Sequence, residues 1–451
     1  MSLVLKGGRV IDRSGERALD VEIGDDGRIA AVGIGLSGDL DLDASGCVVS
    51  AGFVDLHTHL REPGQEEAET IETGARGGSL GGYTALVAMP NTDPATDCVA
   101  VVDQVRNLGR RTTCEVIPSA AMTVGREGVD MAPMGELVDA GVGIFTDDGT
   151  GLQDPRLMRR VMEYSTGLAG RLGRRVVLAQ HCEVSALSAG GFMHEGEWSS
   201  RLGIPGQPAE AEELMVMRDI ALVRLTGAHM HFQHLSTASS VAMVRGAKAA
   251  GLPVTAEATT HHFTLTDAAC ASYDPVFKVH PPLRTDTDVA AVKEGLADGT
   301  IDAVATDHAP HTLEEKNVPY PKSPSGLPAV ENLLPLILNQ VNAGKCTLQQ
   351  LVSWMCDAPA RTWDMVDKGR IAVGYDADLV LVDLQMEKEI RNEEQLTKSG
   401  WSPWHGTTLT GWPVQTWVLG QLVYRNGEVD DSIRGREVQF DHGRGGFWAT
   451  M

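Results

Sequence analysis

The chain has 451 residues, which is more than one simple core needs, so a large domain with a smaller one is expected. Hydrophobic residues make up 42% and charged residues 22%, as is typical of globular proteins. The formal net charge of −23 argues against nucleic acid and anionic membranes as partners. It leaves room for an anionic small molecule, because a single well-placed arginine can bind one.

No segment is predicted to enter or cross a membrane. No apolar run approaches the roughly 18–20 residues that span a bilayer, and residues 1–6 lack the apolar core of a signal peptide. The seven cysteines are scattered, odd in number and without a Cys-x-x-Cys pair, which indicates reduced thiols. We therefore expect a cytoplasmic protein.

Both ends of the chain predict short β-strands. Near the start, apolar runs separated by glycine turns occur at 3–5, 10–11, 21–23, 29–32 and 48–49. Near the end, similar runs occur at 377–382, 415–418 and 422–424. We predict that residues 1–51 and 368–430 form one small β domain, split in sequence, and that 431–451 form a C-terminal tail.

The middle of the chain, 52–367, alternates between strand and helix patterns. Strand-like runs occur at 53–56, 83–89, 115–121, 142–146, 175–180, 229–234, 253–258 and 301–306. Helix-like stretches include 97–111, 154–172, 208–225, 236–250 and 286–296. Eight alternating strands predict a (β/α)8 barrel. The alternative, an open doubly wound sheet, favours a glycine-rich phosphate loop after its first strand, and His-Thr-His-Leu-Arg stands there instead.

Polar side chains follow the predicted strands repeatedly, at the end of a barrel where active sites lie. His57 and His59, two residues apart, project from the same face of the first strand. The candidates at strand ends are His57, His59, Asn91, Asp147, Asp148, His181, His234, Asp307 and His308. So many polar strand ends favour a single functional site.

The residue types point to metal ions. His57, His59 and Asp307 could hold one ion, and His181 and His234 a second, since neutral imidazoles suit a borderline metal such as zinc. A carboxylate could bridge the two, and both acids of the Asp147-Asp148 pair are placed for that. Paired ions activate water and polarise a carbonyl group, which suits hydrolysis.

Each residue alone also has a structural explanation. His181 could be a buried histidine bonded to a backbone carbonyl, and His234 or Asp307 could cap a helix. We expect His229, His231 and His261 to be structural or to support the ligands, and we place His194 at the surface. The set as a whole, at successive strand ends, favours function.

Eight stretches carry a resemblance to a known family: 52–64, 69–74, 89–94, 145–149, 180–183, 234–237, 281–284 and 305–311. The most specific are Phe-Thr-Asp-Asp-Gly (145–149) and Ala-Thr-Asp-His-Ala-Pro-His (305–311). On these motifs the chain resembles the amidohydrolase superfamily, and within it the dihydroorotases of the longer bacterial type.

The resemblance implies a metal-bearing (β/α)8 barrel with a small β domain. It implies zinc, one or two ions, on His57, His59 and Asp307 and on His181 and His234, with Asp148 as the bridge and Asp147 as the second choice. It also implies that Asp307 is catalytic. The implied reaction interconverts N-carbamoyl-L-aspartate and (S)-dihydroorotate in pyrimidine biosynthesis.

The resemblance further implies the substrate contacts. Arg61 and Asn91 match the pair that binds a free carboxylate, which suits the bidentate guanidinium. His311 matches a further contact, and Ser325 and Gly326 match backbone contacts from a lid. The family commonly has asparagine where this chain has His280, which raises a question about the substrate. Residues 309–328, rich in Pro, Lys and Glu, form a long connection after the eighth strand, and long loops at that face are often lids.

Two alternatives to dihydroorotase stay open. Hydantoinases, dihydropyrimidinases and allantoinases are similar, but they generally bridge their metals with a carboxylated lysine, and 142–146 contains no lysine. An inactive partner of aspartate transcarbamoylase would be expected to have lost metal ligands, whereas the set here is complete. A homodimer or an association with aspartate transcarbamoylase is compatible with either an active or an inactive chain.

Overall fold

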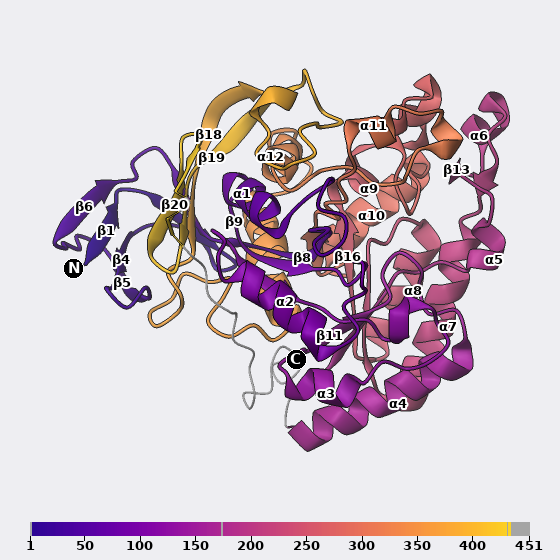
Figure 1. Ribbon diagram of the computed structural model, residues 1–451. Helices are drawn as coiled ribbons and strands as arrows, with labels where there is room; N and C mark the ends of the chain where they lie inside the picture. The colour runs from indigo at the N-terminus through magenta and orange to yellow at the C-terminus, as the bar shows by residue number, and fades with distance from the viewer. Residues whose placement is uncertain (1, 173–174, 431, 434–451) are drawn as a thin grey trace.

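The computed structural model describes residues 2–172, 175–430 and 432–433. The predicted tail, 431–451, lies outside these residues except for 432 and 433. Figure 1 shows a helix-surrounded barrel with a group of strands beside it, formed by the two ends of the described chain.

Eight parallel strands form the barrel. They are β8 (Phe53–Thr58), β9 (Tyr83–Ala88), β10 (Glu115–Pro118), β11 (Ile144–Thr146), β12 (Val177–Gln180), β15 (His229–Phe232), β16 (Val254–Thr259) and β17 (Ala303–Ala305). Two parallel sheets, β10-β9-β8 and β11-β12-β15-β16-β17, are joined by the bridges Ala120–Phe145 and Thr58–His308. Every residue of these eight strands is buried except His229, the first residue of β15, as expected for strands covered on both faces. The prediction of a (β/α)8 barrel is confirmed.

Helices connect the strands along the outside of the barrel (Figure 1). The main ones are α1 (Ile71–Gly81), α2 (Val99–Gly109), α3 (Met134–Asp139), α4 (Pro155–Leu172), α7 (Glu210–Thr226), α8 (Ala238–Ala249), α10 (Asp286–Asp298) and α12 (Leu333–Asn342). Their starts follow local sequence chemistry: at α10, the Thr285 hydroxyl accepts from the Asp288 amide, and the Asp288 carboxylate accepts from the Thr285 amide. The five predicted helices are confirmed to within a few residues.

Short elements extend the connections at the end of the barrel where the strands finish. Between β12 and α7 lie α5 (Ser185–Ser188), β13 (Met193–His194), α6 (Glu197–Leu202) and β14 (Gly206–Gln207). α9 (Thr260–Thr264) follows β16, and α11 (Leu313–Lys316) follows β17. The connections at this end share a core that includes Tyr320, Leu327 and Trp401. Two further short helices, α13 (Leu348–Val352) and α14 (Ala358–Thr362), follow α12, and α14 lies beside the start of β12, where Arg175 donates to the carbonyl groups of Arg361 and Thr362.

The prediction that His194 lies at the surface is wrong. The residue belongs to β13, which pairs with β14 in a short two-stranded sheet. Its side chain is buried, and its Nδ1 lies 3.2 Å from Nη1 of the buried Arg284. A polar neighbourhood in sequence did not reveal this contact, because Arg284 is 90 residues away.

The two ends of the chain share one sheet, as predicted. A seven-stranded sheet has the order β21-β20-β19-β18-β7-β2-β3, in which β7 (Val48–Ala51) pairs antiparallel with β18 (Leu379–Glu389). A second sheet has the order β5-β4-β1-β6. The remaining strands are β1 (Leu3–Lys6), β2 (Arg9–Asp12), β3 (Gly15–Ala18), β4 (Asp20–Ile23), β5 (Ile29–Gly33), β6 (Leu40–Asp43), β19 (Thr408–Val418), β20 (Gln421–Arg425) and β21 (Glu428–Val429).

Strands β3 and β6 were not predicted. Both lie at sheet edges and are largely exposed, so they carry few of the apolar residues that mark a strand. Indigo and yellow strands lie together in Figure 1, which shows how the two ends meet. The exact domain boundaries at 51, 367 and 430 stay predictions.

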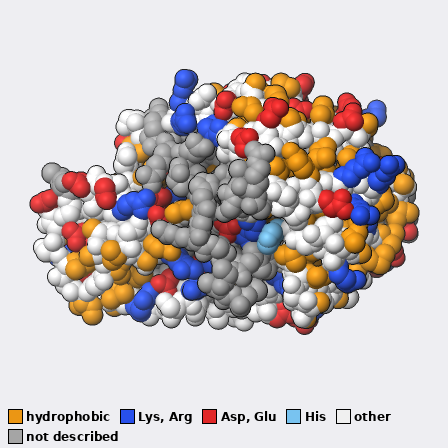
Figure 2. Space-filling model, turned by 90° about the horizontal axis from the view of Figure 1, so that it is seen from below, with side chains coloured by type: hydrophobic (Ala, Val, Ile, Leu, Met, Phe, Trp, Pro, Cys, Tyr) orange, Lys and Arg blue, Asp and Glu red, His pale blue; other side chains and the backbone are white. Residues whose placement is uncertain are grey.

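A membrane-spanning helix is absent from the described residues, and the one face shown in Figure 2 carries no continuous basic patch among its described side chains. Among the described residues, no helix is long and apolar enough to cross a bilayer. On the face shown in Figure 2, the described Lys and Arg side chains occur in separate small groups with acidic side chains between them.

Candidate active site

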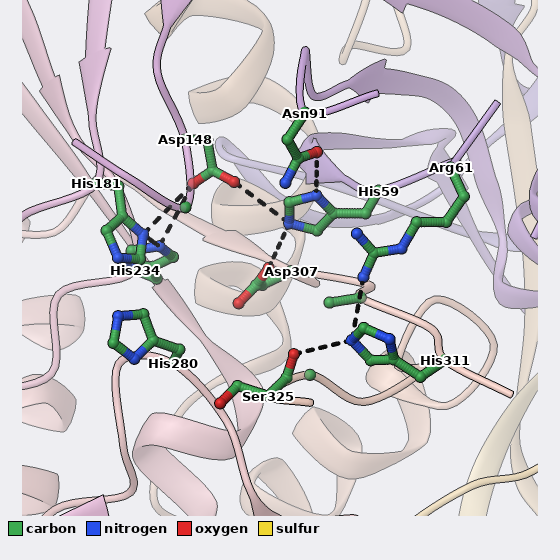
Figure 3. Close-up of a pocket in the computed structure, with 13 residues that line it drawn as sticks. His59, Arg61, Asn91, Asp148, His181, His234, His280, Asp307, His311 and Ser325 are labelled. Carbon is green, nitrogen blue, oxygen red and sulfur yellow. Dashed lines mark hydrogen bonds and ion pairs between the residues drawn. The ribbon is translucent and has the colours of Figure 1, made fainter. Parts of the chain in front are cut away.

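A cavity of about 330 Å³ lies where the barrel strands end. Its lining includes every predicted substrate residue and most predicted metal ligands (Figure 3). The lining residues are His59, Arg61, Asn91, Asp148, Gly149, His181, His234, His280, Asp307, Ala309, His311, Ser325 and Gly326. The structure therefore brings together residues that are up to 267 positions apart, from His59 to Gly326.

The backbone is strained at three of these positions. Arg61, His234 and Asp307 have φ angles of 61°, 32° and 45°, in the region that residues with a side chain rarely adopt. Each follows a barrel strand directly or within three residues. Strain of this kind persists only where the surroundings impose it, and it clusters at functional sites.

His57, His59 and Asp307 form one group of candidate ligands, as predicted. Asp307 Oδ1 lies 3.1 Å from His59 Nε2 and 3.5 Å from His57 Nε2. All three side chains are buried. The two imidazole nitrogens at the end of β8 thus face one carboxylate oxygen at the end of the neighbouring strand β17.

Asp148 lies among four imidazoles. Its Oδ1 is 3.3 Å from His57 Nε2, 3.6 Å from His181 Nδ1 and 3.7 Å from His234 Nε2, and its Oδ2 is 3.5 Å from His59 Nε2. One carboxylate thereby touches the predicted ligands of both ions. This is the arrangement that a bridging carboxylate requires.

Asp147, the other candidate for the bridge, is occupied elsewhere. Its Oδ1 accepts hydrogen bonds from the amides of Met122 and Thr123, at 2.8 and 3.1 Å. Its Oδ2 accepts from the Thr123 hydroxyl at 2.5 Å. Asp147 therefore holds the segment after β10, and the geometry favours Asp148 as the bridge.

Two of the imidazoles are oriented by oxygen acceptors on their outer side. The Nδ1–H of His59 donates to Asn91 Oδ1 at 2.8 Å, and the Nε2–H of His181 faces Glu183 Oε2 at 3.4 Å. An amide oxygen and a carboxylate only accept, so the proton lies on the outer nitrogen of each ring. The inner nitrogen then directs its lone pair into the site.

His57 is oriented by a buried chain of polar groups. Its Nδ1–H donates to Glu257 Oε1 at 2.8 Å, and Glu257 Oε2 accepts from His231 Nε2–H at 3.1 Å. His231 Nδ1 in turn lies 2.9 Å from the Thr255 hydroxyl. This places His231 in the supporting position expected for it and leaves the Nε2 lone pair of His57 facing Asp148.

The donor set fits a divalent metal ion. His57 Nε2 and Asp148 Oδ1 are buried and have no hydrogen-bond partner among the described residues. The inner nitrogens of His181 and His234 face each other at 2.9 Å. Converging lone pairs repel one another and are costly to bury unpaired, whereas one cation can accept several of them.

The charges of the site also favour a cation. Burial raises the pKa of Asp148, but His57, His181 and His234 outweigh it and hold that pKa well below its ordinary range. For Asp307, burial is likewise outweighed, mainly by His57 and His59, and its pKa is lowered. Both acids are therefore ionised, and they stabilise positive charge between them.

Arg61 and His311 form the opposite wall of the pocket from His181 and His234 (Figure 3). Arg61 Nε donates to the Pro310 carbonyl at 3.1 Å. Burial lowers the pKa of Arg61 to about 10, so the side chain is still charged at neutral pH. The bond to Pro310 uses one of the five N–H donors of Arg61, and donors of the guanidinium group are left for a ligand.

His311 is fixed by the loop that follows it. Its Nε2 lies 3.0 Å from the Ser325 carbonyl, which can only accept, so that nitrogen carries the proton. Burial, reinforced by the charge of Arg61, lowers the pKa of His311 to about 3. His311 is therefore neutral.

His280 lines the pocket beside the predicted second metal ligand set. Its ring stacks on that of His181, with centroids 5.0 Å apart and an interplanar angle of 17°. Its Nε2 contacts the Glu183 carboxylate. Burial and the neighbouring His181 lower the pKa of His280 to about 4, so a neutral ring replaces the amide that the resemblance leads one to expect.

Comparison with known proteins agrees with this geometry. A family model described as dihydro-orotase-like matches residues 46–240. A dihydroorotase from Pelotomaculum thermopropionicum is 44% identical over 94% of this chain and 99% of its own. A dihydroorotase from Bacillus subtilis is 40% identical over 95% of this chain and 100% of its own. The chain belongs to the dihydroorotase family.

Solved structures of related enzymes share the fold of this dihydroorotase family member. An L-hydantoinase (dihydropyrimidinase) from Arthrobacter aurescens aligns with a TM-score of 0.86 at 25% identity, over 97% of this chain and 99% of its own. A dihydropyrimidinase from Brevibacillus agri aligns with a TM-score of 0.83 at 23% identity, over 98% and 99%. The barrel and the attached β domain are therefore common to this group of cyclic-amide hydrolases.

Sequence reasoning missed two acids of the site, Glu183 and Glu257. Glu257 stands inside the otherwise apolar strand 253–258, and a buried acid in such a strand was the available signal. Glu183 follows His181 by two residues and was read only as part of a motif. Glu257 acts on His57 through a hydrogen bond that joins two separate strands, which a single sequence does not display, whereas Glu183 acts on the nearby His181.

Proposed function

We propose that this chain interconverts N-carbamoyl-L-aspartate and (S)-dihydroorotate, as a dihydroorotase of pyrimidine biosynthesis. The observation that carries the proposal is the position of Asp148 among four inward-facing imidazoles, in the same pocket as the charged Arg61. The first feature suits hydrolysis of an amide and the second suits a substrate with a free carboxylate.

The proposed cofactor is zinc, one or two ions. His57, His59 and Asp307 would hold one ion, His181 and His234 the second, and Asp148 would bridge them. When bound, such ions polarise the amide carbonyl and make water nucleophilic near neutral pH. Imidazole and carboxylate ligands in this ratio suit zinc.

Asp307 is the proposed general base and acid. Its carboxylate is ionised and lies at the centre of the pocket, between the two groups of histidines (Figure 3). In hydrolysis it would take a proton from the attacking water and give it to the ring nitrogen as the C–N bond breaks. In cyclisation the same carboxylate would carry the proton the other way.

The remaining lining residues would hold the substrate. Arg61 would bind its free carboxylate, with a further donor from the Asn91 amide group, whose oxygen is already taken by His59. His311 and the Ser325-Gly326 backbone would contact the ring from the opposite loop. His280, neutral and bonded to Glu183, would take the place of the asparagine that is usual in the family.

The test is a rate comparison on zinc-loaded protein with dihydroorotate, dihydrouracil, hydantoin and allantoin. We expect a preference for dihydroorotate that collapses when Arg61 is replaced by methionine, while turnover of the uncharged rings changes little. Preferential turnover of the uncharged rings by the unmodified protein would contradict the proposal. So would bound metal without turnover of any ring, which would favour an inactive partner protein.

A hydantoinase-type activity is the second candidate, favoured by His280 and by the structural likeness to the Arthrobacter aurescens enzyme. Two features speak against it. Arg61 brings a buried positive charge that an uncharged ring does not need. Strand β11 and the residues before it, 142–146, contain no lysine that could be carboxylated.

We also propose a cytoplasmic location, supported by seven cysteines that are all free. A homodimer and an association with aspartate transcarbamoylase stay predictions, which co-purification from the source cells would test. The small-molecule substrate requires neither of them.

A further inference from the structure

We infer that Lys278 and Lys316 are positioning residues that hold residues 320–326 as a fixed wall of the pocket in the resting protein. This inference deepens the proposed function and rests on it for the identity of the ligand. It assigns a fixed wall where a long connection such as 309–328 often acts as a lid, because residues 320–326 are fastened by hydrogen bonds to two buried amines.

Both lysines are buried, with exposed fractions of 5% for Lys278 and 2% for Lys316. Neither has a carboxylate within ion-pair distance among the described residues. Burying an ammonium without a counter-ion is costly, so its three N–H donors need other acceptors. Backbone carbonyl groups supply them.

Lys278 bonds three carbonyl oxygens of the wall. Its Nζ lies 3.0 Å from the oxygen of Tyr320, 3.2 Å from that of Pro321 and 2.6 Å from that of Ser323. The rings of Phe192 and Tyr320 lie 4.8 and 5.6 Å from the same nitrogen. The three donors of this ammonium are therefore all engaged.

Lys316 completes the arrangement from the other side. Its Nζ lies 3.0 Å from the Pro324 oxygen, 2.9 Å from the Gly326 oxygen and 3.4 Å from the Lys278 oxygen. Burial and the nearby Lys278 lower the pKa of Lys316 to about 7. The carbonyl oxygens act against this shift, because only the charged amine offers three donors to three acceptors.

Five of the seven carbonyl groups in 320–326 thus point at two amines. The segment contains two prolines, and apart from the short turn Tyr320–Lys322 it has no regular structure of its own. Its conformation is set from outside, by these hydrogen bonds and by the Gly326 amide, which donates to the Lys278 carbonyl at 2.9 Å. Charge-assisted bonds of this kind are stronger than neutral ones.

The wall carries the pocket residues directly. Ser325 and Gly326 line the cavity, and the Ser325 carbonyl accepts from His311, which lies beside Arg61. If the lysines release the segment, these contacts lose their fixed positions. None of the proposed metal ligands lies within 320–326, and Asp307 precedes this segment just after β17, so the expected defect is in substrate binding.

Hydrogen exchange on the unmodified, metal-loaded protein tests the inference without any variant. We expect the amides of Lys322, Ser323 and Gly326 to exchange slowly in the resting protein and to change less than about twofold with saturating N-carbamoyl-L-aspartate. Fast exchange at rest, slowed about tenfold or more by that ligand, would overturn the fixed wall and restore the lid. The exchange rate at rest is read without ligand or turnover, so this part of the result is independent of the proposed reaction.

A matched set of variants tests the role of the amines. For Lys316→Met and Lys278→Met we expect faster exchange of the same amides and a KM for dihydroorotate raised about tenfold, with kcat and metal content near normal. Lys322→Met, at an exposed lysine of the same segment, should change none of these. Unchanged exchange and KM in both buried-lysine variants would overturn the inference, as would a fall in kcat alone.

Discussion

Two groups of buried charged side chains lie at opposite ends of the barrel strands, and they differ in what neutralises them. At the start of β10, Glu115 meets Asp376 and Asp378 of the β domain, and Lys368 Nζ contacts all three carboxylates. At the other end, Asp148 and Asp307 meet imidazoles that carry no obligatory charge. One group contains its own cation, and the other has the ligands for a cation from solution.

This difference distinguishes a cluster of acids that stabilises the fold from a cluster that can bind a metal ion. Burial lowers the pKa of Lys368, but Asp378, Glu115 and Asp376 outweigh it, and the net effect is to raise that pKa. Its charge is therefore permanent and holds the β domain against the barrel. By distances alone, both groups could hold a metal ion. The group at the start of β10 already holds the Lys368 ammonium among its carboxylates. At the strand ends, the buried His57 Nε2 and Asp148 Oδ1 have no hydrogen-bond partner among the described residues.

The largest effect is expected from a substitution at Asp307, in the group at the strand ends. We expect Asp307→Asn to lower kcat by about 10³-fold or more, because the amide cannot move the proton. Metal content should stay close to normal, since His57, His59 and Asp148 remain. Kinetics and metal analysis on the same preparation check this, with the exposed Asp286→Asn as control. A nearly normal rate with bound metal would disprove the catalytic role.

At the other end, Lys368→Met should act on stability. Removing the ammonium leaves three buried carboxylates together, which we expect to lower the free energy of unfolding by about 3–5 kcal/mol. Urea denaturation measures it, with the exposed Lys345→Met as control. Adding Glu115→Gln and Asp378→Asn should restore part of the loss. If stability were unchanged, Lys368 would not be the internal cation.

Arg61→Lys tests whether the charge or the shape of the guanidinium group matters for substrate binding. Lysine keeps the charge but loses the planar, bidentate fork. We expect kcat/KM for dihydroorotate to fall about 10–100-fold, mainly through KM. Steady-state kinetics beside the Arg61→Met protein would show which part of the effect is charge. Equal losses in the two variants would mean that geometry decides, and no loss in Arg61→Lys would mean that charge alone does.

The smallest expected effect is at Glu257. Glu257→Gln keeps an oxygen that can accept from His57 but removes the carboxylate charge, so we expect metal affinity to fall about tenfold. Competition with a chelator measures this change. Glu331→Gln serves as control, because Glu331 is equally buried but accepts from the amides of Leu396 and Thr397. Equal affinities in both variants would remove Glu257 from the metal site.

The sequence predicted the barrel and the place of the site because both depend on local patterns. The spacing of His57 and His59 places both side chains on one face of a strand, and Asp307 and His308 directly follow an apolar run, so both pairs can be recognised in the sequence. The eight strands are confirmed, and the predicted site residues other than His57 line one cavity. Their individual roles stay predictions.

What the sequence could not show depends on contacts between distant elements. The choice between Asp147 and Asp148 needed the amides of Met122 and Thr123, which occupy only the first. Lys278 and Lys316 look like ordinary surface lysines in sequence, since nothing local indicates that carbonyl groups will surround them. The same holds for His194, buried by Arg284.

The pairing of β7 with β18 also bears on how the chain is made. β7 ends at residue 51 and β18 begins at residue 379, so β18 is synthesised about 15–65 s after β7 at ordinary rates of translation. Through that interval β2, β3 and β7 would be synthesised without the neighbours that complete their sheet. A truncated chain that stops before residue 379 would keep that edge exposed, which makes premature termination a route to aggregation.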